Sequence, residues 1–316
     1  MFDLSGKSIW VAGHRGMVGA ALVRRLRRDG HSVITAGRDT LDLMRQAQVE
    51  DWFAANRPDV VIVAAARVGG IAANAARPVD FLHDNLMIEA NIMRAAANSA
   101  VAKLLFLGSS CIYPRLAPQP MAEDALLTGS LEETNQWYAI AKIAGIKLAQ
   151  AYRQQMGLDF ISAMPTNLYG PGDNYDLESS HVIPALLRKA IEARDSGAET
   201  ATVWGSGTPL REFMHVDDLA DALVFLLEQY SAADHINVGT GEEVTIAQVA
   251  QTIADTVGFT GRLVFDASRP DGSPRKLMNS QRLLALGWAP RIGLADGLAD
   301  AYRHFIESDR QRFLAA

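Results

Sequence analysis

The stretch Ser8-Ile9-Trp10-Val11-Ala12-Gly13-His14-Arg15-Gly16-Met17-Val18-Gly19 decides the fold of this chain. Its first five residues predict a buried strand, and the segment from Val18 to Arg28 predicts an amphipathic helix. The three glycines between strand and helix let the backbone turn tightly and approach a pyrophosphate. The N–H groups and the positive dipole end of the helix would then bind the phosphates. The spacing G-x-x-G-x-x-G between a strand and a helix therefore predicts a dinucleotide-binding loop.

Alternating apolar runs and helical patterns continue after this loop. Further strands are predicted at residues 32–36, 60–64, 103–107 and 160–164, and helices at 47–56, 80–99 and 137–155. Fully apolar strands that alternate with helices are typical of a parallel sheet covered on both faces. We therefore predict an α/β fold, with a Rossmann-type doubly wound parallel sheet and a smaller mixed α/β substrate domain.

Strands and helices no longer alternate regularly after Pro165. We expect a helix at 183–194, strands at 202–204 and 235–238, and a helix whose N-cap is Asp217 or Asp218. This pattern suggests a dinucleotide-binding domain over residues 1–165, with returning segments near 211–240. A partly interleaved substrate-binding domain would occupy residues 166–316.

Composition excludes several classes of protein. The 316 residues are 49% hydrophobic and 21% charged, with a net charge of -6, which disfavours a general nucleic-acid binder. A single cysteine cannot form an internal disulfide, and the N-terminal segment lacks a secretion signal, so we expect a cytoplasmic protein. No apolar stretch approaches the ~20 residues needed to span a bilayer, and the histidines lack metal-ligand spacing. We expect no membrane, nucleic-acid or metal partner.

The choice between NAD and NADP depends on residues that follow the second strand. An arginine there accommodates the 2′-phosphate of NADP, whereas an acidic residue binds the free ribose hydroxyl of NAD. Arg38 and Arg15 favour NADP, while Asp39 favours NAD. Asp42 would lie near the adenine. On balance the sequence favours NADP(H).

Three residues have the types and spacing that hydride transfer at an alcohol or carbonyl carbon needs. Tyr138 and Lys142 are four residues apart on a predicted helix, so their side chains share one face. We expect the lysine ammonium to lower the pKa of Tyr138, which would exchange a proton with the substrate oxygen. Ser109, just past the fourth strand, would donate a hydrogen bond to the same oxygen.

The lone cysteine, Cys111, lies two residues after Ser109. Hydride transfer does not require a thiol, so Cys111 suggests a second, acid–base reaction in the same pocket. To act as a base it would need a depressed pKa or a neighbour that accepts its proton. The alternative is that Cys111 is a small buried apolar residue.

Together these motifs resemble the extended short-chain dehydrogenases/reductases that act on nucleotide sugars. The resemblance runs nearly end to end. It is strongest for members that epimerise GDP-4-keto-6-deoxy-D-mannose at C3 and C5 and then reduce C4 with NADPH. The segments Ser109-Ser110-Cys111 and Ser180-His181-Val182-Ile183-Pro184-Ala185 are particular to those members. The other matching segments are 13–19, 64–71, 107–114, 138–142, 165–171, 204–209, 211–213 and 270–272.

The resemblance also implies roles for individual residues. Cys111 and His181 would be the acid–base pair of the epimerisation, and Ser109, Tyr138 and Lys142 would carry out the reduction. Lys189, Trp204, Arg211 and Asp271 would contact the substrate, with Lys189 at a position that is often arginine. A homodimer built from the helices at 80–99 and 137–155 is expected. The cofactor would be bound by Gly13, His14, Arg15, Gly16, Met17, Val18, Gly19, Arg38, Asp42, Leu107, Gly108, Ser109, Ser110, Lys142, Pro165, Thr166, Asn167, Leu168 and His181.

Two other classes of function are considered, another nucleotide-sugar enzyme and a non-enzymatic sensor. A nucleotide-sugar 4-epimerase, 4-reductase or dehydratase would share the fold and the Tyr138–Lys142 pair. Ser110-Cys111 occupies the place of the acidic pair that a dehydratase would carry, and a 4-epimerase would not need Cys111 or His181. A non-enzymatic NADP-binding sensor is disfavoured, because it could dispense with Tyr138 or Lys142.

Overall fold

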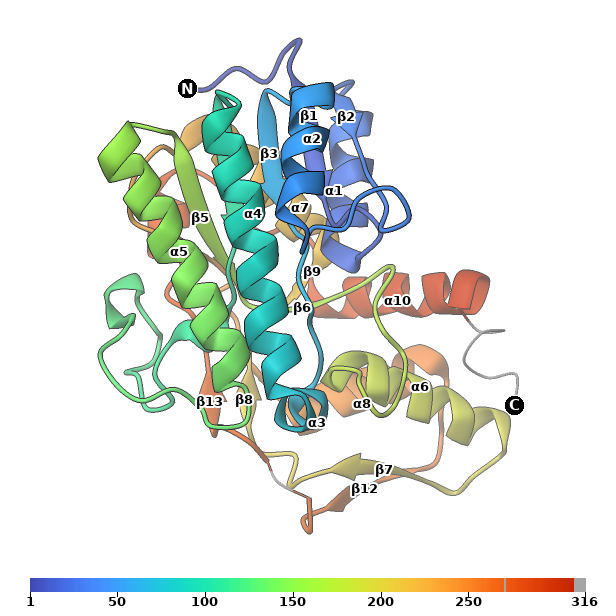
Figure 1. Cartoon of the computed structure of the whole chain (residues 1–316). Helices are drawn as coiled ribbons and strands as arrows, with labels where there is room; N and C mark the ends of the chain where they lie inside the picture. The colour runs from blue at the N-terminus through green and yellow to red at the C-terminus, as the bar shows by residue number, and fades with distance from the viewer. Residues whose placement is uncertain (270, 310–316) are drawn as a thin grey trace.

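The computed structural model describes residues 1–269 and 271–309, so Pro270 and residues 310–316 of the expected second domain lie outside the described residues. A six-stranded parallel sheet forms its centre, in the order β10-β5-β4-β3-β1-β2 (Figure 1). The strand order reverses around β1, which has β2 on one side and β3 on the other. Ligands of such sheets bind beyond the carboxyl ends of the strands at this reversal. The strands are β1 (Ser8–Ala12), β2 (Ser32–Ile34), β3 (Val60–Val63), β4 (Lys103–Leu107), β5 (Phe160–Pro165) and β10 (Ile236–Val238).

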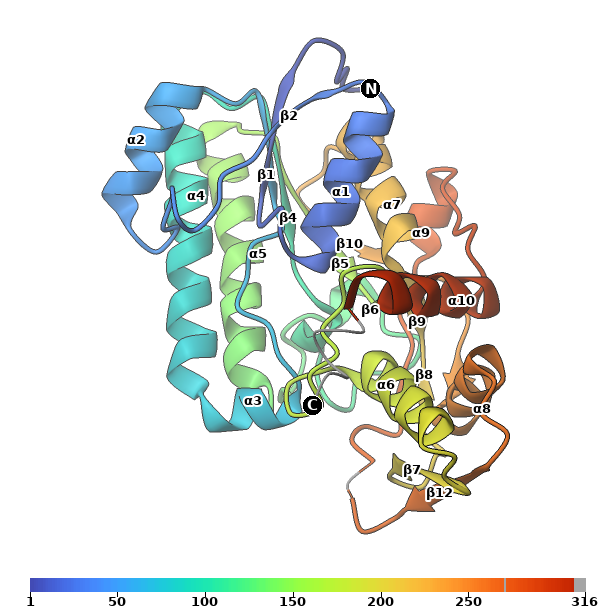
Figure 2. The ribbon, with the colours of Figure 1, turned by 90° about the vertical axis from the view of Figure 1, so that its right-hand side faces the viewer.

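Helices cover both faces of this sheet, which confirms the predicted doubly wound arrangement (Figure 2). One face carries α1 (Met17–Arg28) and α7 (Val216–Gln229), and the other carries α2 (Gln46–Asn56), α4 (Asn85–Asn98) and α5 (Gln136–Met156). Side chains alternate along β1 because successive residues of a strand point to opposite faces. Ile9 and Val11 join the cluster under α1 and α7, whereas Trp10 joins the cluster under α2 and α4.

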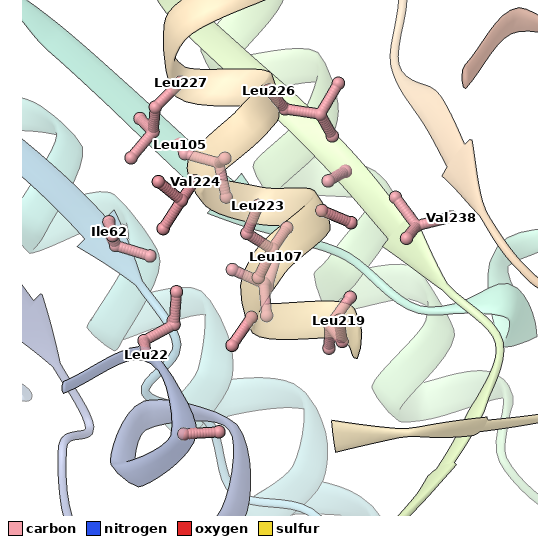
Figure 3. Packing of buried hydrophobic residues seen from close by; sticks show 14 of the residues in the cluster. Leu22, Ile62, Leu105, Leu107, Leu219, Leu223, Val224, Leu226, Leu227 and Val238 are labelled. Carbon is pink, nitrogen blue, oxygen red and sulfur yellow. The ribbon is translucent and has the colours of Figure 1, made fainter. Parts of the chain in front are cut away.

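The first of these clusters fixes the position of the glycine loop. In Figure 3, Leu22 of α1 and Leu223 of α7 lie over Ile62 and Leu105 of the sheet, and all four side chains are fully buried. Burial of a leucine side chain contributes roughly 1.5–3 kcal/mol. The packing therefore fixes α1, and with it the loop between β1 and α1, against the sheet.

A third apolar cluster belongs to the second half of the chain. It lies among α6 (Val182–Asp195), α8 (Ile246–Val257), α10 (Leu294–His304) and the parallel pair β7 (Thr200–Trp204) and β12 (Arg262–Asp266). A three-stranded sheet joins β8 (Leu210–Arg211) to β11 (Val244–Thr245) and β13 (Arg275–Lys276), and β6 (Asn167–Tyr169) pairs with β9 (Phe213–His215). The remaining helices are α3 (Ile71–Ala76) and α9 (Gln281–Ala285).

The structure corrects two local predictions. The helix expected at 80–99 starts with a π-helical turn, Asp80–Asp84, and becomes α-helical only from Asn85. The N-cap of α7 is His215 rather than Asp217 or Asp218, since the Nδ1 atom of His215 accepts the N–H of Asp217 at 3.3 Å. Asp218 is not free to cap because its carboxylate accepts the N–H groups of Arg291 and Ile292.

Within the described part of the chain, no helix is both long and apolar enough to cross a membrane. The same residues contain no cluster of three or more histidine, cysteine or acidic side chains arranged to hold a metal ion.

Candidate active site

The loop between β1 and α1 has the backbone of a dinucleotide site. Gly13 has a φ of +88°, and a Cβ there would lie 2.7 Å from the backbone of Ala65. A Cβ at Gly19 would lie 2.2 Å from the carbonyl oxygen of Gly13, so only glycine lets α1 start this close to the strand. Gly16 caps the helix without a side-chain acceptor, and the first turn holds no acidic residue. The N–H groups at this helix start therefore fit a diphosphate.

The residues expected around the adenosine ribose gather beyond β2. Arg38 and Asp39 are exposed, and the Nη2 atom of Arg15 lies 3.2 Å from Oδ1 of Asp39. Asp42 accepts the N–H of Met44 and is half-buried in the adjoining turn. Arg38, Asp39 and Asp42 line one groove. The Asp39 carboxylate is therefore paired with Arg15 beside this groove, so it is not an unpaired negative charge that would repel a 2′-phosphate.

The predicted nicotinamide side lies where β4 and β5 end. The N–H of Gly108 donates to Ala163, and a Cβ at Gly108 would collide with Met164. Beyond β5, the N–H of Thr166 donates to Val238, and the side-chain amide of Asn167 donates to the carbonyl of Glu212 at 2.8 Å. The segments 107–110 and 165–168 are therefore each fixed where neighbouring strands end, at the carboxyl edge of the sheet.

Tyr138 and Lys142 share one face of α5, as predicted. The Nζ atom of Lys142 lies 5.8 Å from the centre of the Tyr138 ring and 4.6 Å from that of Phe106. The expected lowering of the Tyr138 pKa is not found: burial raises it well above its ordinary value, and Cys111 and Glu89 raise it further. Lys142 itself faces the Glu89 carboxylate, 3.9 Å away, in a desolvated site. Tyr138 therefore keeps its proton at neutral pH, as a proton donor must.

Ser109 and Cys111 are joined by a short 3-10 turn, Ser110–Ile112. The hydroxyl of Ser109 caps this turn by accepting the N–H of Cys111 at 3.4 Å. Cys111 is buried, with 8% of its surface exposed. Burial raises the pKa of its thiol, and the charge of Lys276 and the Ser109 hydrogen bond oppose that rise only in part. A depressed thiol pKa is therefore not found, and Cys111 needs a neighbour that takes up its proton.

His181 occupies the N-cap position of α6, where its side chain makes no capping hydrogen bond. The residue as a whole is exposed, yet the surrounding protein desolvates the imidazole enough to lower its pKa, and Lys276 adds to the effect. His181 is therefore a neutral imidazole at neutral pH, able to accept a proton.

Lys276 was not predicted from the sequence. It lies in β13 opposite Arg211 of β8, and its positive charge acts on both Cys111 and His181. Burial lowers its own pKa. No motif marks this lysine, because its position follows from the pairing of two short strands that are distant in sequence. It links the predicted epimerisation residues to the predicted substrate residues.

The expected substrate residues lie in two connected groups. The Nζ atom of Lys189 lies 4.2 Å from the ring centre of Trp204, and Arg269 stacks on the same ring at 4.8 Å. The carboxylate of Asp271 accepts the N–H and the hydroxyl of Ser206, two residues after Trp204, at 2.7 and 2.8 Å. Arg211 donates to the carbonyl of Asp271. The structure thus brings Lys189, Trp204, Arg211 and Asp271 to one region.

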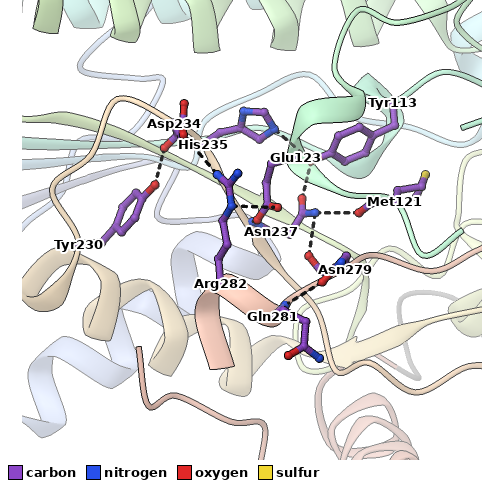
Figure 4. Close-up of polar contacts among 10 residues, drawn as sticks. All are labelled: Tyr113, Met121, Glu123, Tyr230, Asp234, His235, Asn237, Asn279, Gln281 and Arg282. Atoms are coloured by element: carbon purple, nitrogen blue, oxygen red, sulfur yellow. Dashed lines mark hydrogen bonds and ion pairs between the residues drawn. The ribbon is translucent and has the colours of Figure 1, made fainter. Parts of the chain in front are cut away.

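A buried polar network fixes the loop that follows Cys111 (Figure 4). The hydroxyl of Tyr113 donates to the side-chain carbonyl of Asn237, and it contacts Nε2 of His235 at 3.1 Å. The amide of Asn237 donates to the carbonyls of Met121 and Asn279 at 3.0 and 3.1 Å. Burial lowers the pKa of His235 to about 4, so this ring is neutral. The network ties the segments that follow Cys111 and Lys276 to β10.

Comparison with known proteins identifies the family of this chain. Residues 9–239 match the model of the NAD dependent epimerase/dehydratase family. The chain is 56% identical to a GDP-L-fucose synthase of Sinorhizobium fredii, over 98% of both chains. It is 54% identical to the Escherichia coli K12 GDP-L-fucose synthase, over 98% of this chain and 100% of that one.

A solved structure has the same fold. The GDP-L-fucose synthetase of Naegleria fowleri bound to NADP superposes with a TM-score of 0.89 at 30% identity, over 97% of this chain and 96% of that one. The chain therefore belongs to the NAD dependent epimerase/dehydratase family of extended short-chain dehydrogenases/reductases and, within it, to the GDP-L-fucose synthase group.

Proposed function

We propose that this chain converts GDP-4-keto-6-deoxy-D-mannose to GDP-L-fucose, by epimerisation at C3 and C5 and then NADPH-dependent reduction at C4. The observation that carries the proposal is that Cys111 acts electrostatically on Tyr138 and Lys142, while the charge of Lys276 acts on both Cys111 and His181. Ser109, Tyr138 and Lys142 suit a reduction, and Cys111 and His181 suit proton transfer at carbon. Full-length relatives at 54% and 56% identity are GDP-L-fucose synthases, which supports the same substrate here.

The epimerisation depends on the 4-keto group, which acidifies the protons on C3 and C5. One member of the Cys111–His181 pair removes a proton to give an enolate, and the other returns a proton from the opposite face. Their protonation suits an exchange of this kind, because Cys111 is a protonated thiol and His181 a neutral imidazole at neutral pH. The positive charge of Lys276 next to both residues would stabilise negative charge that develops on the thiol or on the enolate oxygen.

The reduction takes place at the same carbonyl. NADPH, when bound, supplies the hydride that C4 accepts. The hydroxyl of Tyr138 donates the proton that the C4 oxygen needs, and Ser109 donates a hydrogen bond to that oxygen. Because the Tyr138 pKa is raised, the phenol is in the protonated form that this step consumes. Lys142 would hold the nicotinamide ribose.

Substrate and cofactor would bind to different parts of the chain. We propose that residues 1–165, with the returning segment 211–240, bind NADPH and that residues 166–316 bind the sugar nucleotide. Lys189 and Arg211 supply positive charge for the diphosphate, and Trp204, which is 54% exposed, offers a ring face beside them. We further propose a cytoplasmic homodimer that pairs α4 and α5, because Trp137 and Ile140 are exposed apolar side chains of α5.

A direct assay distinguishes this function from that of another nucleotide-sugar 4-epimerase or 4-reductase. The purified protein is mixed with NADPH and GDP-4-keto-6-deoxy-D-mannose, and the product is identified by chromatography and NMR. The proposal requires GDP-L-fucose and one NADPH oxidised per sugar. A product reduced at C4 with unchanged C3 and C5 would identify a simple reductase. UDP-galactose formed from UDP-glucose would identify a 4-epimerase.

Replacing Arg38 by alanine should weaken NADPH binding far more than NADH binding. A charge-assisted hydrogen bond to the 2′-phosphate is lost, so the Kd for NADPH should rise by about 10- to 100-fold. The Kd for NADH should stay within about twofold, since NADH lacks this phosphate. Both are measured by cofactor fluorescence, with Arg28→Ala, an exposed arginine at the end of α1, as the control. An equal loss for both cofactors would show that Arg38 does not contact the 2′-phosphate.

A further inference from the structure

A buried carboxylate lies behind the reduction site and takes no part in the mechanism above. Glu89 of α4 is 2% exposed, and its Oε2 atom lies 3.9 Å from Nζ of Lys142. Neither carboxylate oxygen of Glu89 makes a hydrogen bond of ordinary geometry among the described residues, although the backbone N–H of Gly145 favours its charged form weakly. A buried charge without hydrogen bonds is costly, so Glu89 does not stabilise the fold by ordinary polar contacts.

The surrounding packing leaves room for this carboxylate. Gly145 lies one turn after Lys142 on α5, and a Cβ there would meet Oε2 of Glu89 at 2.8 Å and the ring of Phe106 at 2.4 Å. The Phe106 ring also lies against the Lys142 ammonium, 4.6 Å from its centre to Nζ. The three elements α4, α5 and β4 thus form an apolar compartment that holds one carboxylate and one ammonium.

Other charged groups near this compartment have partners elsewhere. The π-helical turn Asp80–Asp84 packs on α5, but Asp80 and Asp84 pair with Arg67 at 3.2 and 2.8 Å. His83 contacts Asp84, and on the outer side of α4, Arg94 pairs with Glu50 of α2. Toward the active site, Lys142 faces the thiol of Cys111 and the phenol of Tyr138. Among the described residues, Glu89 is the carboxylate that acts on Lys142.

We propose that Glu89 is a positioning residue for the reduction, whose buried carboxylate holds the Lys142 ammonium, and its charge, beside Tyr138 and the nicotinamide ribose. This inference rests on the proposed reductase function. Desolvation lowers the pKa of Lys142, and Glu89 opposes that change. Burial raises the pKa of Glu89 itself to about 7. Glu89 therefore helps Lys142 mainly above neutral pH, where the carboxylate is ionised and Lys142 would otherwise begin to lose its proton.

The test is the pH dependence of NADPH binding in Glu89→Gln, which keeps the shape of the side chain and removes its charge. Near pH 6 the Kd should stay within about twofold of the unmodified protein, because Glu89 is then protonated. Without its ionised partner, Lys142 loses its proton at lower pH. By about pH 9 the Kd of the variant for NADPH should therefore be about tenfold higher than that of the unmodified protein. The rate of NADPH oxidation should follow the same trend. At pH 9 the Kd of Glu89→Asp, which keeps a charge, should lie between that of the unmodified protein and that of Glu89→Gln.

Controls separate this role from a purely structural one. Glu50→Gln removes a carboxylate that contacts α4 on its outer side, and it should leave the pH dependence unchanged. Thermal melting reports whether each variant folds. A uniform loss of affinity at every pH, or a Glu89→Gln curve that follows the unmodified protein, would overturn the proposal. NADPH binding needs no sugar, so this result can be read even if the chain fails to turn over GDP-4-keto-6-deoxy-D-mannose.

Discussion

Tyr138→Phe should lower the rate of NADPH oxidation with GDP-4-keto-6-deoxy-D-mannose by about 10³-fold. The variant removes the phenol that protonates the C4 oxygen, and general acid catalysis contributes roughly 10²–10⁴-fold. Binding of NADPH should change little, because Lys142 and the glycine loop remain. Stopped-flow absorbance under single-turnover conditions isolates the chemical step from product release.

Tyr152→Phe is the matched control for this variant. Tyr152 lies on the same helix, nearly four turns further along, and packs against Phe160 away from the reduction site. It should leave the rate unchanged. Exchange of the C3 and C5 protons should persist in Tyr138→Phe, because Cys111 and His181 are intact. A Tyr138→Phe enzyme that reduces the sugar within tenfold of the normal rate would rule out Tyr138 as the proton donor.

Cys111→Ser should abolish most of the epimerisation while leaving the reduction machinery in place. A serine hydroxyl keeps the hydrogen-bonding character of the side chain but is a far weaker acid than a thiol. We therefore expect solvent exchange at C3 and C5 to slow by about 10²- to 10⁴-fold. The measurement is NMR of the sugar ring protons after incubation in deuterated water without NADPH.

A substrate that needs no epimerisation provides the control for Cys111→Ser. When supplied with the already epimerised 4-keto sugar nucleotide and NADPH, the variant should reduce it at close to the normal rate. Slow reduction of this compound would mean that the substitution damages the whole pocket. Normal exchange at both carbons would show that Cys111 is a buried apolar residue and not part of an acid–base pair.

The parts of the fold that follow from local sequence were predicted well. The first strand, the glycine loop and α1 depend on residues that are adjacent in the chain, and the structure places β1 at Ser8–Ala12, as predicted. Tyr138 and Lys142 likewise meet because four residues span one turn of a helix.

Features that depend on contacts between distant segments could not be predicted. Lys276 reaches the site only because β13 pairs with β8, and Glu89 faces Lys142 only because α4 packs on α5. The shift of the Tyr138 pKa was predicted in the wrong direction, since burial, Cys111 and Glu89 all raise this pKa. At α7 the predicted N-cap was Asp217 or Asp218, but His215 caps the helix and Asp218 bonds to the segment at Arg291.

We propose that one pocket carries out proton exchange at two carbons and hydride transfer at the carbon between them. The most direct measurement is a complete reaction with GDP-4-keto-6-deoxy-D-mannose and NADPH in deuterated water, with the product analysed by mass spectrometry and NMR. We expect GDP-L-fucose with one solvent deuterium at C3, one at C5 and none at C4, since the hydride at C4 comes from the cofactor. Oxidation of NADPH with no deuterium at C3 and C5 would contradict the claim and leave the chain a reductase alone.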